Sequence, residues 1–388
     1  MTSRLLAALL VLVPVPGCAA GDELIPERGG HVATPRIVEP TDARVAQLHL
    51  PPGFKVTKFA DGLGQPRMIA VAADGTVYAT RPASGDVLAL RDRDGRAADV
   101  HPVVRDLPRV HGIALRPDAM YLATVDTVYR AALKDGTVGL PEKILSGLPP
   151  GARHPNRTLG FGPDGSLFIS VGSTCNACVE ASPESATILR ASADGARRTV
   201  FARGLRNTIG FAWQPATNAM WGVDHGTDWL GDDFPPEELN RLEEGKDYGW
   251  PFVQDTGKLL PATAFPPGFD RDAALAKATP PVLGYTAHAA PMQMVFYTGA
   301  QFPEPYRDDA FVAMHGSWNR DPPAGYEVVR VEFENGRPVA LRPFLNGFLV
   351  EDGHATFGRP TGLGVARDGA LLVGDDTTGV IYRVSYTP

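Results

Sequence analysis

The sequence reads Arg157-Thr-Leu-Gly-Phe-Gly-Pro-Asp-Gly-Ser-Leu-Phe168 near its middle, two short apolar runs joined by an Asp-Gly turn. Such a pattern is typical of a β-hairpin. The same unit recurs at Arg67, His111 and Thr361, and looser copies begin at Asn207 and Gln293. Asp74, Asp118 and Asp164 share one turn position and lie 44 and 46 residues apart. This period predicts an all-β fold, a six-bladed β-propeller with four-stranded antiparallel blades.

The propeller is expected to span residues 46–388. Phe54-Lys-Val-Thr-Lys-Phe59 and Val380-Ile-Tyr-Arg-Val-Ser-Tyr386 both have the character of strands. We expect them to share one blade, because otherwise the first and last blades leave exposed sheet edges. A longer gap between the fourth and fifth copies, about 228–290, is rich in Pro, Trp and acidic residues and is interpreted as a loop insertion.

The first 18 residues have the pattern of a secretory signal peptide. Arg4 is followed by an apolar run from Leu5 to Val15, which is too short to span a bilayer as a mature helix. Gly17-Cys18 indicates a lipobox with a lipid on Cys18, and ordinary cleavage after Ala20 is the alternative. Residues 19–45 are polar and aperiodic, which predicts a flexible linker. We therefore expect an exported protein, periplasmic or anchored to a membrane and facing the periplasm or cell exterior.

Charge and cysteine content exclude several classes of protein. The formal net charge is −7, with no basic run of five residues, which argues against a nucleic-acid partner. Only three cysteines occur, so disulfides are not the main source of stability. Cys175-Asn-Ala-Cys178 is followed by Val179, where haem attachment needs histidine. A short disulfide between Cys175 and Cys178 is the prediction, which would stiffen a loop at the rim.

Polar residues are predicted to converge at one end of the central channel. The innermost strand of each blade begins at the same end where its antiparallel neighbour finishes, so these positions across six copies form one rim. The strand starts, with their flanking residues, include Arg67, His111, Arg157, Arg206, Asn207 and Arg359, and the neighbouring ends include His225, His315 and Asp376. Basic groups around a preformed pocket indicate an anionic ligand. A hydrated channel would need polar groups in any case.

An ordered set of segments resembles the soluble sugar dehydrogenase and sorbosone dehydrogenase family, whose members use pyrroloquinoline quinone (PQQ). The similarity runs from about residue 47 to the last strand. The matching segments are Leu50-Pro-Pro-Gly-Phe-Lys55, Leu159-Gly-Phe-Gly-Pro-Asp-Gly165, Gly204-Leu-Arg-Asn-Thr208, Asn240 with Tyr248-Gly-Trp-Pro251, His315-Gly-Ser-Trp-Asn-Arg320, Gly358-Arg-Pro360 and Asp375-Asp376.

The resemblance implies a set of site residues. His154 takes the place of the general base, a role that suits imidazole. Arg206, Asn207, Arg359 and Asp376 match cofactor-binding positions, as guanidinium forks suit a quinone with three carboxylates. A cofactor calcium would be bound by the main-chain carbonyls of Gly226 and Thr227 and would polarise the quinone.

The sequence departs from the family at three positions. His225 stands in place of a cofactor-binding glutamine, Thr361 in place of a second arginine, and no lysine occurs from Ser317 to Arg320. Arg320 is expected to supply the missing positive charge at the cofactor. Asp232, Asp233 and Glu238 belong to a dense acidic segment that is a candidate second calcium site, with a solvated acidic loop as the alternative.

The leading hypothesis is a periplasmic oxidoreductase that oxidises a sugar or sugar-derived aldehyde with PQQ and calcium. No haem motif occurs, so electrons would pass to an external acceptor. A calcium-dependent propeller lactonase is one alternative, although its metal site calls for carboxylates and amides more than arginines. A lipid-anchored binding protein without catalysis is the other.

Overall fold

The computed structural model describes residues 23–25, 29–261 and 265–387. The predicted signal peptide, residues 1–18, and Cys18 lie outside the described residues. The described chain is almost entirely strands and turns, with two short α-helices, α1 (Asp42–Val45) and α2 (Arg271–Lys277), and two 3-10 turns, Glu304–Tyr306 and Glu351–Gly353. Within it, no helix has the length and apolar character needed to cross a bilayer.

The described residues form six main antiparallel sheets, each built mostly from strands that follow one another in the chain. The first contains β3 (Ile69–Val71), β4 (Val77–Arg81), β5 (Asp86–Arg93) and β6 (Arg96–Val104). The second contains β7 (Gly112–Arg116), β8 (Ala119–Ala123), β9 (Thr127–Lys134), β10 (Thr137–Val138) and β11 (Glu142–Ser146). The third contains β12 (Leu159–Phe161), β13 (Leu167–Val171), β14 (Thr187–Ala191) and β15 (Arg198–Arg203).

The other three sheets follow the same plan. The fourth contains β16 (Thr208–Trp213), β17 (Met220–Asp224), β18 (Glu237–Leu242) and β21 (Leu283–Tyr285). The fifth contains β22 (Pro291–Phe296), β23 (Ala310–Met314), β24 (Glu327–Glu334) and β25 (Arg337–Leu345). The sixth contains β28 (Pro360–Val365), β29 (Leu371–Asp375), β30 (Val380–Tyr386) and, from the other end of the chain, β2 (Phe54–Ala60).

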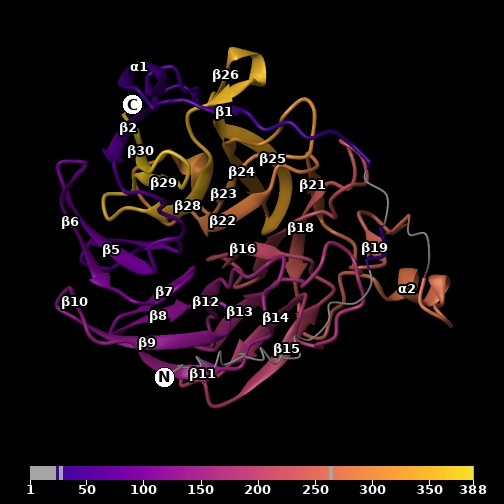
Figure 1. Cartoon of the computed structure of the whole chain (residues 1–388). Helices are drawn as coiled ribbons and strands as arrows, with labels where there is room; N and C mark the ends of the chain where they lie inside the picture. The colour runs from indigo at the N-terminus through magenta and orange to yellow at the C-terminus, as the bar shows by residue number, and fades with distance from the viewer. Residues whose placement is uncertain (1–22, 26–28, 262–264, 388) are drawn as a thin grey trace, which may run out of the picture.

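Neighbouring sheets meet through their innermost strands, in the arrangement of a β-propeller (Figure 1). Contacts run from β3 to β7 to β12 on one side, from β16 to β22 to β28 on the other, and β28 contacts β3. β2 pairs with β30 from Phe54 opposite Tyr386 onward, as the two terminal segments were predicted to do. The first and last parts of the described propeller therefore lie in one sheet.

Glycines in the innermost strands let neighbouring sheets approach closely. A Cβ atom on Gly112 would lie 2.5 Å from the carbonyl oxygen of Arg157, and one on Gly362 would lie 2.5 Å from that of Arg67. Both distances are far inside van der Waals contact, so only glycine fits at these two positions. The repeated glycine after the first polar residue is thus a packing requirement, and it sets basic residues of adjacent sheets beside one another.

The Asp-Gly turns have the structure that the repeat predicted. Asp74 and Asp164 each accept a hydrogen bond from the main-chain N–H two residues later, at 2.9 and 3.0 Å. The glycines that follow, Gly75 and Gly165, have φ angles of +91° and +79°, which residues with side chains rarely adopt. These turns lie at the end of each blade away from the starts of the innermost strands.

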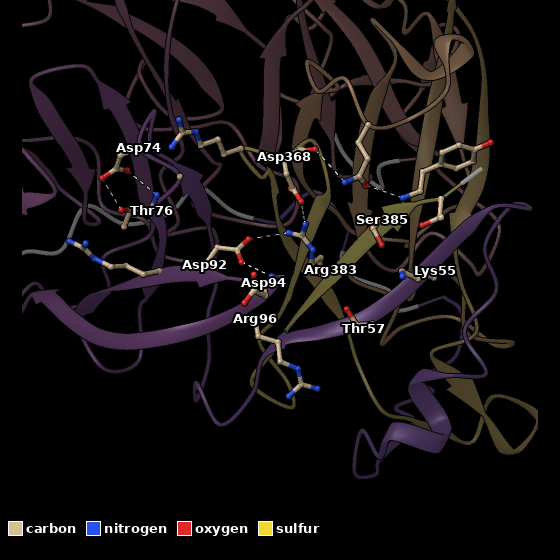
Figure 2. Close-up of a pocket in the computed structure, with 17 residues that line it drawn as sticks. Lys55, Thr57, Asp74, Thr76, Asp92, Asp94, Arg96, Asp368, Arg383 and Ser385 are labelled. Carbon is tan, nitrogen blue, oxygen red and sulfur yellow. Dashed lines mark hydrogen bonds and ion pairs between the residues drawn. The ribbon is translucent and has the colours of Figure 1, made fainter.

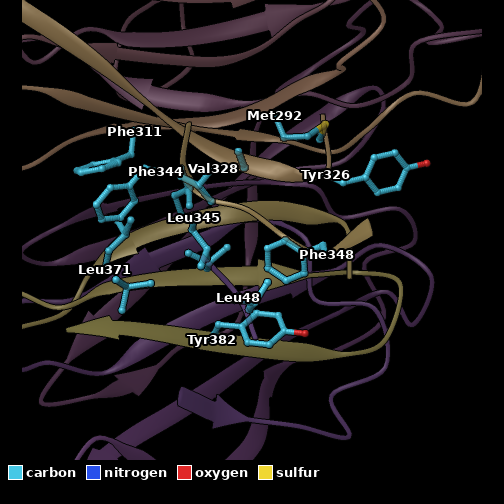
Figure 3. Packing of buried hydrophobic residues seen from close by; sticks show 14 of the residues in the cluster. Leu48, Met292, Phe311, Tyr326, Val328, Phe344, Leu345, Phe348, Leu371 and Tyr382 are labelled. Carbon is cyan, nitrogen blue, oxygen red and sulfur yellow. The ribbon is translucent and has the colours of Figure 1, made fainter. Parts of the chain in front are cut away.

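The apolar core lies between facing sheets, and Figure 3 shows the part between the fifth and sixth. Phe311 of β23 packs against Phe344 of β25, with ring centroids 4.6 Å apart. Leu371 and Tyr382 of the sixth sheet complete this cluster and are fully buried. The sheet that contains both β2 and β30 is thus held by packing as well as by hydrogen bonds.

The segment predicted as a loop insertion, about 228–290, contains two strands of the fourth sheet. β18 and β21 lie inside it, and the stretch between them holds α2 and a small hairpin, β19 (Val253–Gln254) with β20 (Lys258–Leu259). β18 was hard to recognise because Glu237, a charged residue, is one of its buried positions, at 3% exposure.

The described residues of the segment predicted as a flexible linker, residues 19–45, are attached to the propeller, beginning with Leu24 N, which donates to Ala177 O at 2.8 Å. Gly29 N donates to Trp229 O at 3.0 Å, and Ala33 N donates to Trp318 O at 3.1 Å. Further along, β1 (Arg36–Ile37) pairs with β27 (Ala355–Thr356), which also pairs with β26 (Leu349–Val350). These are main-chain bonds, which need no apolar periodicity, so the sequence pattern did not reveal them. We call residues 29–38 the N-terminal arm.

Candidate active site

The structure brings the predicted polar residues together at one end of the channel, which we call the mouth. His154 and Asn207 both lie against Gly172, where an added Cβ would be 2.6 Å from His154 Cβ and 2.8 Å from Asn207 Oδ1. The other polar residues of the mouth are connected by the contacts given in the next paragraphs. The mouth is defined here by Arg67, His111, His154, Arg157, Arg206, Asn207, His225, His315, Arg359 and Asp376.

His154 is oriented by Ser173. Its Nδ1 lies 2.8 Å from Ser173 Oγ and 3.0 Å from Ser173 O, while Ser173 Oγ donates its own hydrogen to Cys175 O at 2.8 Å. Both Ser173 oxygens are therefore acceptors toward the ring, so Nδ1 carries the hydrogen and Nε2 carries the lone pair. Burial, followed by the positive charge of Arg206, lowers the pKa of His154 well below its ordinary value. The ring is neutral near pH 7 and able to accept a proton at Nε2.

Arg206 and Asn207 are fixed by one buried carboxylate at the start of β16. Their main-chain N–H groups donate to the two oxygens of Asp224 at 2.8 and 2.9 Å. Burial raises the pKa of Asp224 to about 6, and these hydrogen bonds act in the opposite direction. The Arg206 guanidinium binds Asp228 at 2.8 Å and is only 3% exposed, whereas Asn207 is 8% exposed.

A second cluster lies across the mouth between the fifth, sixth and first sheets. Asp376 accepts from His315 Nε2 at 2.9 Å and forms a short ion pair with Arg67. Burial opposes ionisation of Asp376, but His315 and Arg67 hold its pKa well below the usual range. Because burial lowers the pKa of His315 itself to about 4, Arg67 supplies the lasting positive charge. Asp376 is thus a structural counter-ion as well as a predicted cofactor residue.

Two arginines at the mouth keep charge that no carboxylate neutralises by direct contact. Arg359 donates to the carbonyl oxygens of His315 and Gly316 at 3.1 and 2.5 Å. Arg157 is fully buried, donates to three carbonyl oxygens, and has no partner for Nε among the described residues. Carbonyl acceptors satisfy the N–H groups and leave the charge, so the mouth has an excess of positive charge. This observation fits a ligand with several carboxylates.

His225 and Gly226 are fixed by hydrogen bonds to Pro291 and Glu237. His225 Nε2 donates to Pro291 O at 2.6 Å, and burial lowers the pKa of His225 to about 4. Gly226 N donates to Glu237 at 2.8 Å. Thr227 Oγ1 is buried and has no hydrogen-bond partner within the described chain. An unpartnered oxygen beside the Gly226 and Thr227 carbonyls fits a cation-binding segment.

Some predicted site residues have other partners. Arg320, expected to supply positive charge to a cofactor, donates instead to Asp232 O and, at 2.7 Å, to Asp233 Oδ1. Asp232 also accepts from His31 of the N-terminal arm. Glu238 lies with Asn240 and Asp255. In the described part of the chain, no group of three His, Cys, Asp or Glu side chains that could hold a metal ion includes Asp232, Asp233 or Glu238. These residues therefore do not form the second calcium site that was predicted for them together; they make ion pairs and hydrogen bonds with other residues.

Sequence reasoning missed Asn176, and it placed Arg67 at the rim without predicting its ion pair with Asp376. The disulfide between Cys175 and Cys178 is formed as predicted, and Asn176 between them binds Arg206. A position enclosed by two cysteines was the available signal for Asn176. Gln293 was read as a rim residue, but its side chain bonds the main chain of Ile69 and Leu363, which ties three innermost strands together below the mouth.

A cavity of about 1130 Å³ lies on the opposite face, between the sixth and first sheets (Figure 2). It is lined by the Asp74 and Asp368 turns and by strand residues such as Arg383. Arg383 is paired with Asp92 at 3.3 Å and with Asp368, so opposite charges there compensate one another. The cavity shares no residue with the mouth.

Comparison with known proteins agrees with this geometry. The family model described as TrAA12-like matches residues 48–387. The chain belongs to the TrAA12-like family. An uncharacterized protein of Borreliella burgdorferi is 30% identical over 87% of this chain and 91% of its own length. The pyrroloquinoline quinone-dependent pyranose dehydrogenase of Coprinopsis cinerea is 33% identical over 28% of this chain and 17% of its own length.

A solved structure shares the fold of this TrAA12-like protein. The calcium structure of the Trichoderma reesei carbohydrate-active enzyme of family AA12 superposes with a TM-score of 0.76 and 20% identity, covering 92% of this chain and all of that one. Further relatives are a pyrroloquinoline quinone-dependent sugar dehydrogenase of Hypocrea jecorina, 24% identical over 85% of this chain and 87% of its own length, and an aldose sugar dehydrogenase of Escherichia coli, 31% identical over 28% of this chain and 27% of its own length. The resemblance drawn from the sequence motifs is therefore confirmed.

The contacts of His154 with Ser173 predict its tautomer, and its burial beside Arg206 predicts its lowered pKa. We expect nitrogen-detected NMR of the protein without added ligand to show hydrogen on Nδ1 and a pKa clearly below the ordinary value of about 6.5. The resonance is assigned by its loss in His154→Gln. Hydrogen on Nε2 would contradict the orientation by Ser173, and titration at the ordinary pKa would contradict the effect of burial beside Arg206.

Proposed function

We propose that this TrAA12-like protein is a six-bladed propeller oxidoreductase that oxidises a sugar or sugar-derived aldehyde with PQQ and calcium. The observation that carries the proposal is the combination of a neutral histidine, His154, whose Nε2 carries the lone pair, and two arginines, Arg157 and Arg359, that contact no carboxylate side chain among the described residues. The first suits removal of a hydroxyl proton, and the second suits an acidic quinone. Two relatives are named as pyrroloquinoline quinone-dependent dehydrogenases of pyranose or sugar, which supports the same function.

The residues that would hold the cofactor follow from their exposure and partners. Arg359 is partly exposed and Asn207 is 8% exposed, so both would present donors to the cofactor, while the more deeply buried Arg206 is paired with Asp228. His225 and Asp376 complete the predicted contacts, and the carbonyls of Gly226 and Thr227 would hold calcium. PQQ, when bound, supplies a two-electron acceptor for hydride, and calcium polarises it.

His154 performs the proton step in this proposal. Its Nδ1–H is retained by Ser173, so the lone pair on Nε2 takes the proton from the substrate hydroxyl. The lowered pKa keeps the ring unprotonated before the reaction. Once Nε2 is protonated, burial and Arg206 destabilise the imidazolium and favour release of the proton. The electrons leave to an external acceptor.

A lactonase explains the mouth less well. Such a site needs several free carboxylates and amides around one metal. Asp376 is paired with Arg67 and His315, and Asp228 is paired with Arg206. The acidic groups at the mouth therefore serve as counter-ions, and the uncompensated charge is positive.

Reconstitution tests the function. The purified protein with PQQ and calcium is expected to reduce an artificial electron acceptor when sugars or aldehydes are added. His154→Gln is expected to lower kcat by about 10²- to 10⁴-fold, the usual contribution of a general base, with quinone affinity retained. His101→Gln, at an exposed site far from the mouth, is the matched control. Quinone binding without turnover across a broad panel would support a binding protein; neither binding nor turnover would reject the proposal.

A second cation is proposed beside β18, where buried oxygens lack partners. Asn240 Oδ1 and both side-chain polar atoms of Gln254 are buried without hydrogen bonds among described residues, and Glu238 contacts the Asn240 side chain and Asp255 N. Hard oxygen donors of this kind suit calcium. This site replaces the predicted one at Asp232 and Asp233.

Calcium is therefore expected to raise thermal stability through Glu238. At a concentration of about 100 times Kd, a bound ion adds about 2.7 kcal/mol to the free energy of unfolding. Calorimetric scans with calcium or chelator should show this gain in the wild type and in Asp232→Asn, and its loss in Glu238→Gln. If only Asp232→Asn lost the calcium-dependent gain in stability, the ion would bind at Asp232 and Asp233 as the sequence predicted.

Export and a lipid tether at Cys18 are also proposed, on the basis of the apolar leader and the Gly-Cys pair. Cys18 precedes Glu23 by five residues, at most about 18 Å of extended chain. Glu23 contacts the Cys175–Cys178 loop, so a lipid there would hold the mouth near a membrane. Mass spectrometry of the membrane fraction should find a lipidated N-terminal cysteine, and Cys18→Ser should release the protein. An unmodified wild-type protein cleaved after Ala20 would reject the tether.

A further inference from the structure

Asn176 uses all of its polar groups in contacts around the mouth, although it lies in a loop and is only 3% exposed. Its main-chain carbonyl and its Oδ1 accept from Arg206 Nε and Nη2 at 3.0 and 2.8 Å. The same Oδ1 accepts from Asp228 N at 2.9 Å, and Nδ2 donates to Asp228 O at 3.1 Å. Asn176 thus grips a guanidinium and the main chain of the segment after Gly226 and Thr227.

Only an amide meets these demands. The Oδ1 atom must accept twice while Nδ2 donates to a carbonyl. An aspartate in this place would set a carboxylate oxygen against Asp228 O and would neutralise Arg206 directly. Alanine would remove one of the three hydrogen bonds that hold the buried Arg206 guanidinium, because only the main-chain carbonyl of residue 176 and Asp228 would remain.

The same loop holds the partner of His154. Ser173 is fully buried, faces His154 Nδ1 with two oxygens, and donates its hydroxyl hydrogen to Cys175 O. Ser173 N donates to Arg206 O at 2.8 Å. Within four residues, 173–176, the chain therefore carries the groups that orient both the candidate base and the buried arginine.

The disulfide fixes this loop where hydrogen bonds alone would leave it mobile. Cys175 and Cys178 are joined across two residues, and both are buried against Trp250 and Ala186. Closing so short a loop removes little entropy from the unfolded chain, so the expected effect on overall stability is small. Glu23 adds a second restraint by accepting from Asn176 N and Ala177 N at 2.9 and 3.0 Å.

We propose that the Cys175–Cys178 loop is the positioning element of the mouth, with Asn176 as a positioning residue that aligns Arg206 and the 226–228 segment while Ser173 aligns His154. The part that concerns Arg206 rests on the proposed PQQ function. The part that concerns His154 does not, because the orientation of the ring is measurable without any ligand.

The experiment compares Asn176→Ala and the double variant Cys175→Ala/Cys178→Ala with the wild type. Val179→Ala is the matched control, since Val179 adjoins the loop and is 49% exposed. Calorimetry with PQQ should show affinity weakened by about 10- to 100-fold in Asn176→Ala, the usual loss when a residue supporting a ligand-binding group is removed. In the double variant, NMR should show mixed tautomers of His154, because Ser173 would no longer hold the hydrogen on Nδ1. The midpoint of thermal unfolding should change little in either variant.

The outcomes separate the two proposals. If the wild type binds no PQQ, the proposed function fails, and the His154 measurement in the double variant still decides the role of the loop. If the double variant does not fold, reduction of the folded wild type with a phosphine gives the same comparison. Unchanged quinone affinity in Asn176→Ala together with an unchanged His154 tautomer on loss of the disulfide would overturn the inference.

Discussion

The close approach of innermost strands at glycine positions is the constraint on which the mouth depends. Where Gly112 and Gly362 lie, the carbonyls of Arg157 and Arg67 occupy the space that a side chain would need. Each strand therefore starts within a few ångströms of its neighbour, and its first polar residue faces the same small volume. Any larger residue at these two positions would separate adjacent sheets and disperse the arginines, so the packing of the fold and the charge of the site have a common origin.

Much of the fold could be predicted because its signals are local and repeated. The Asp-Gly turns carry both their hydrogen bond and their left-handed glycine in two adjacent residues, and the apolar runs beside them pair with one another. β18 did not follow this rule, since Glu237 points inward and bonds Gly226 and Ala290. The N-terminal arm did not follow it either, because its attachment uses main-chain atoms that any sequence possesses.

The sequence predicted which residues lie at the mouth better than it predicted which partner each of them contacts. Repeats align the starts and ends of strands, which placed Arg206, Arg359 and Asp376 at one end of the channel, and the family resemblance added His154. Which carboxylate each arginine meets depends on loops whose course the repeat does not determine. Arg320 forms an ion pair with Asp233. Asn176 binds Arg206 from a loop that the sequence marks only by its two cysteines.

The two ends of the described chain lie on different faces. Glu23 rests on the Cys175–Cys178 loop beside the mouth, while Thr387 lines the cavity between the sixth and first sheets on the other side. A fusion partner or surface linkage attached at the carboxyl end would leave the mouth facing solution, whereas the same attachment before Glu23 would crowd it. For immobilisation on an electrode, the carboxyl end is the point that keeps the entrance accessible.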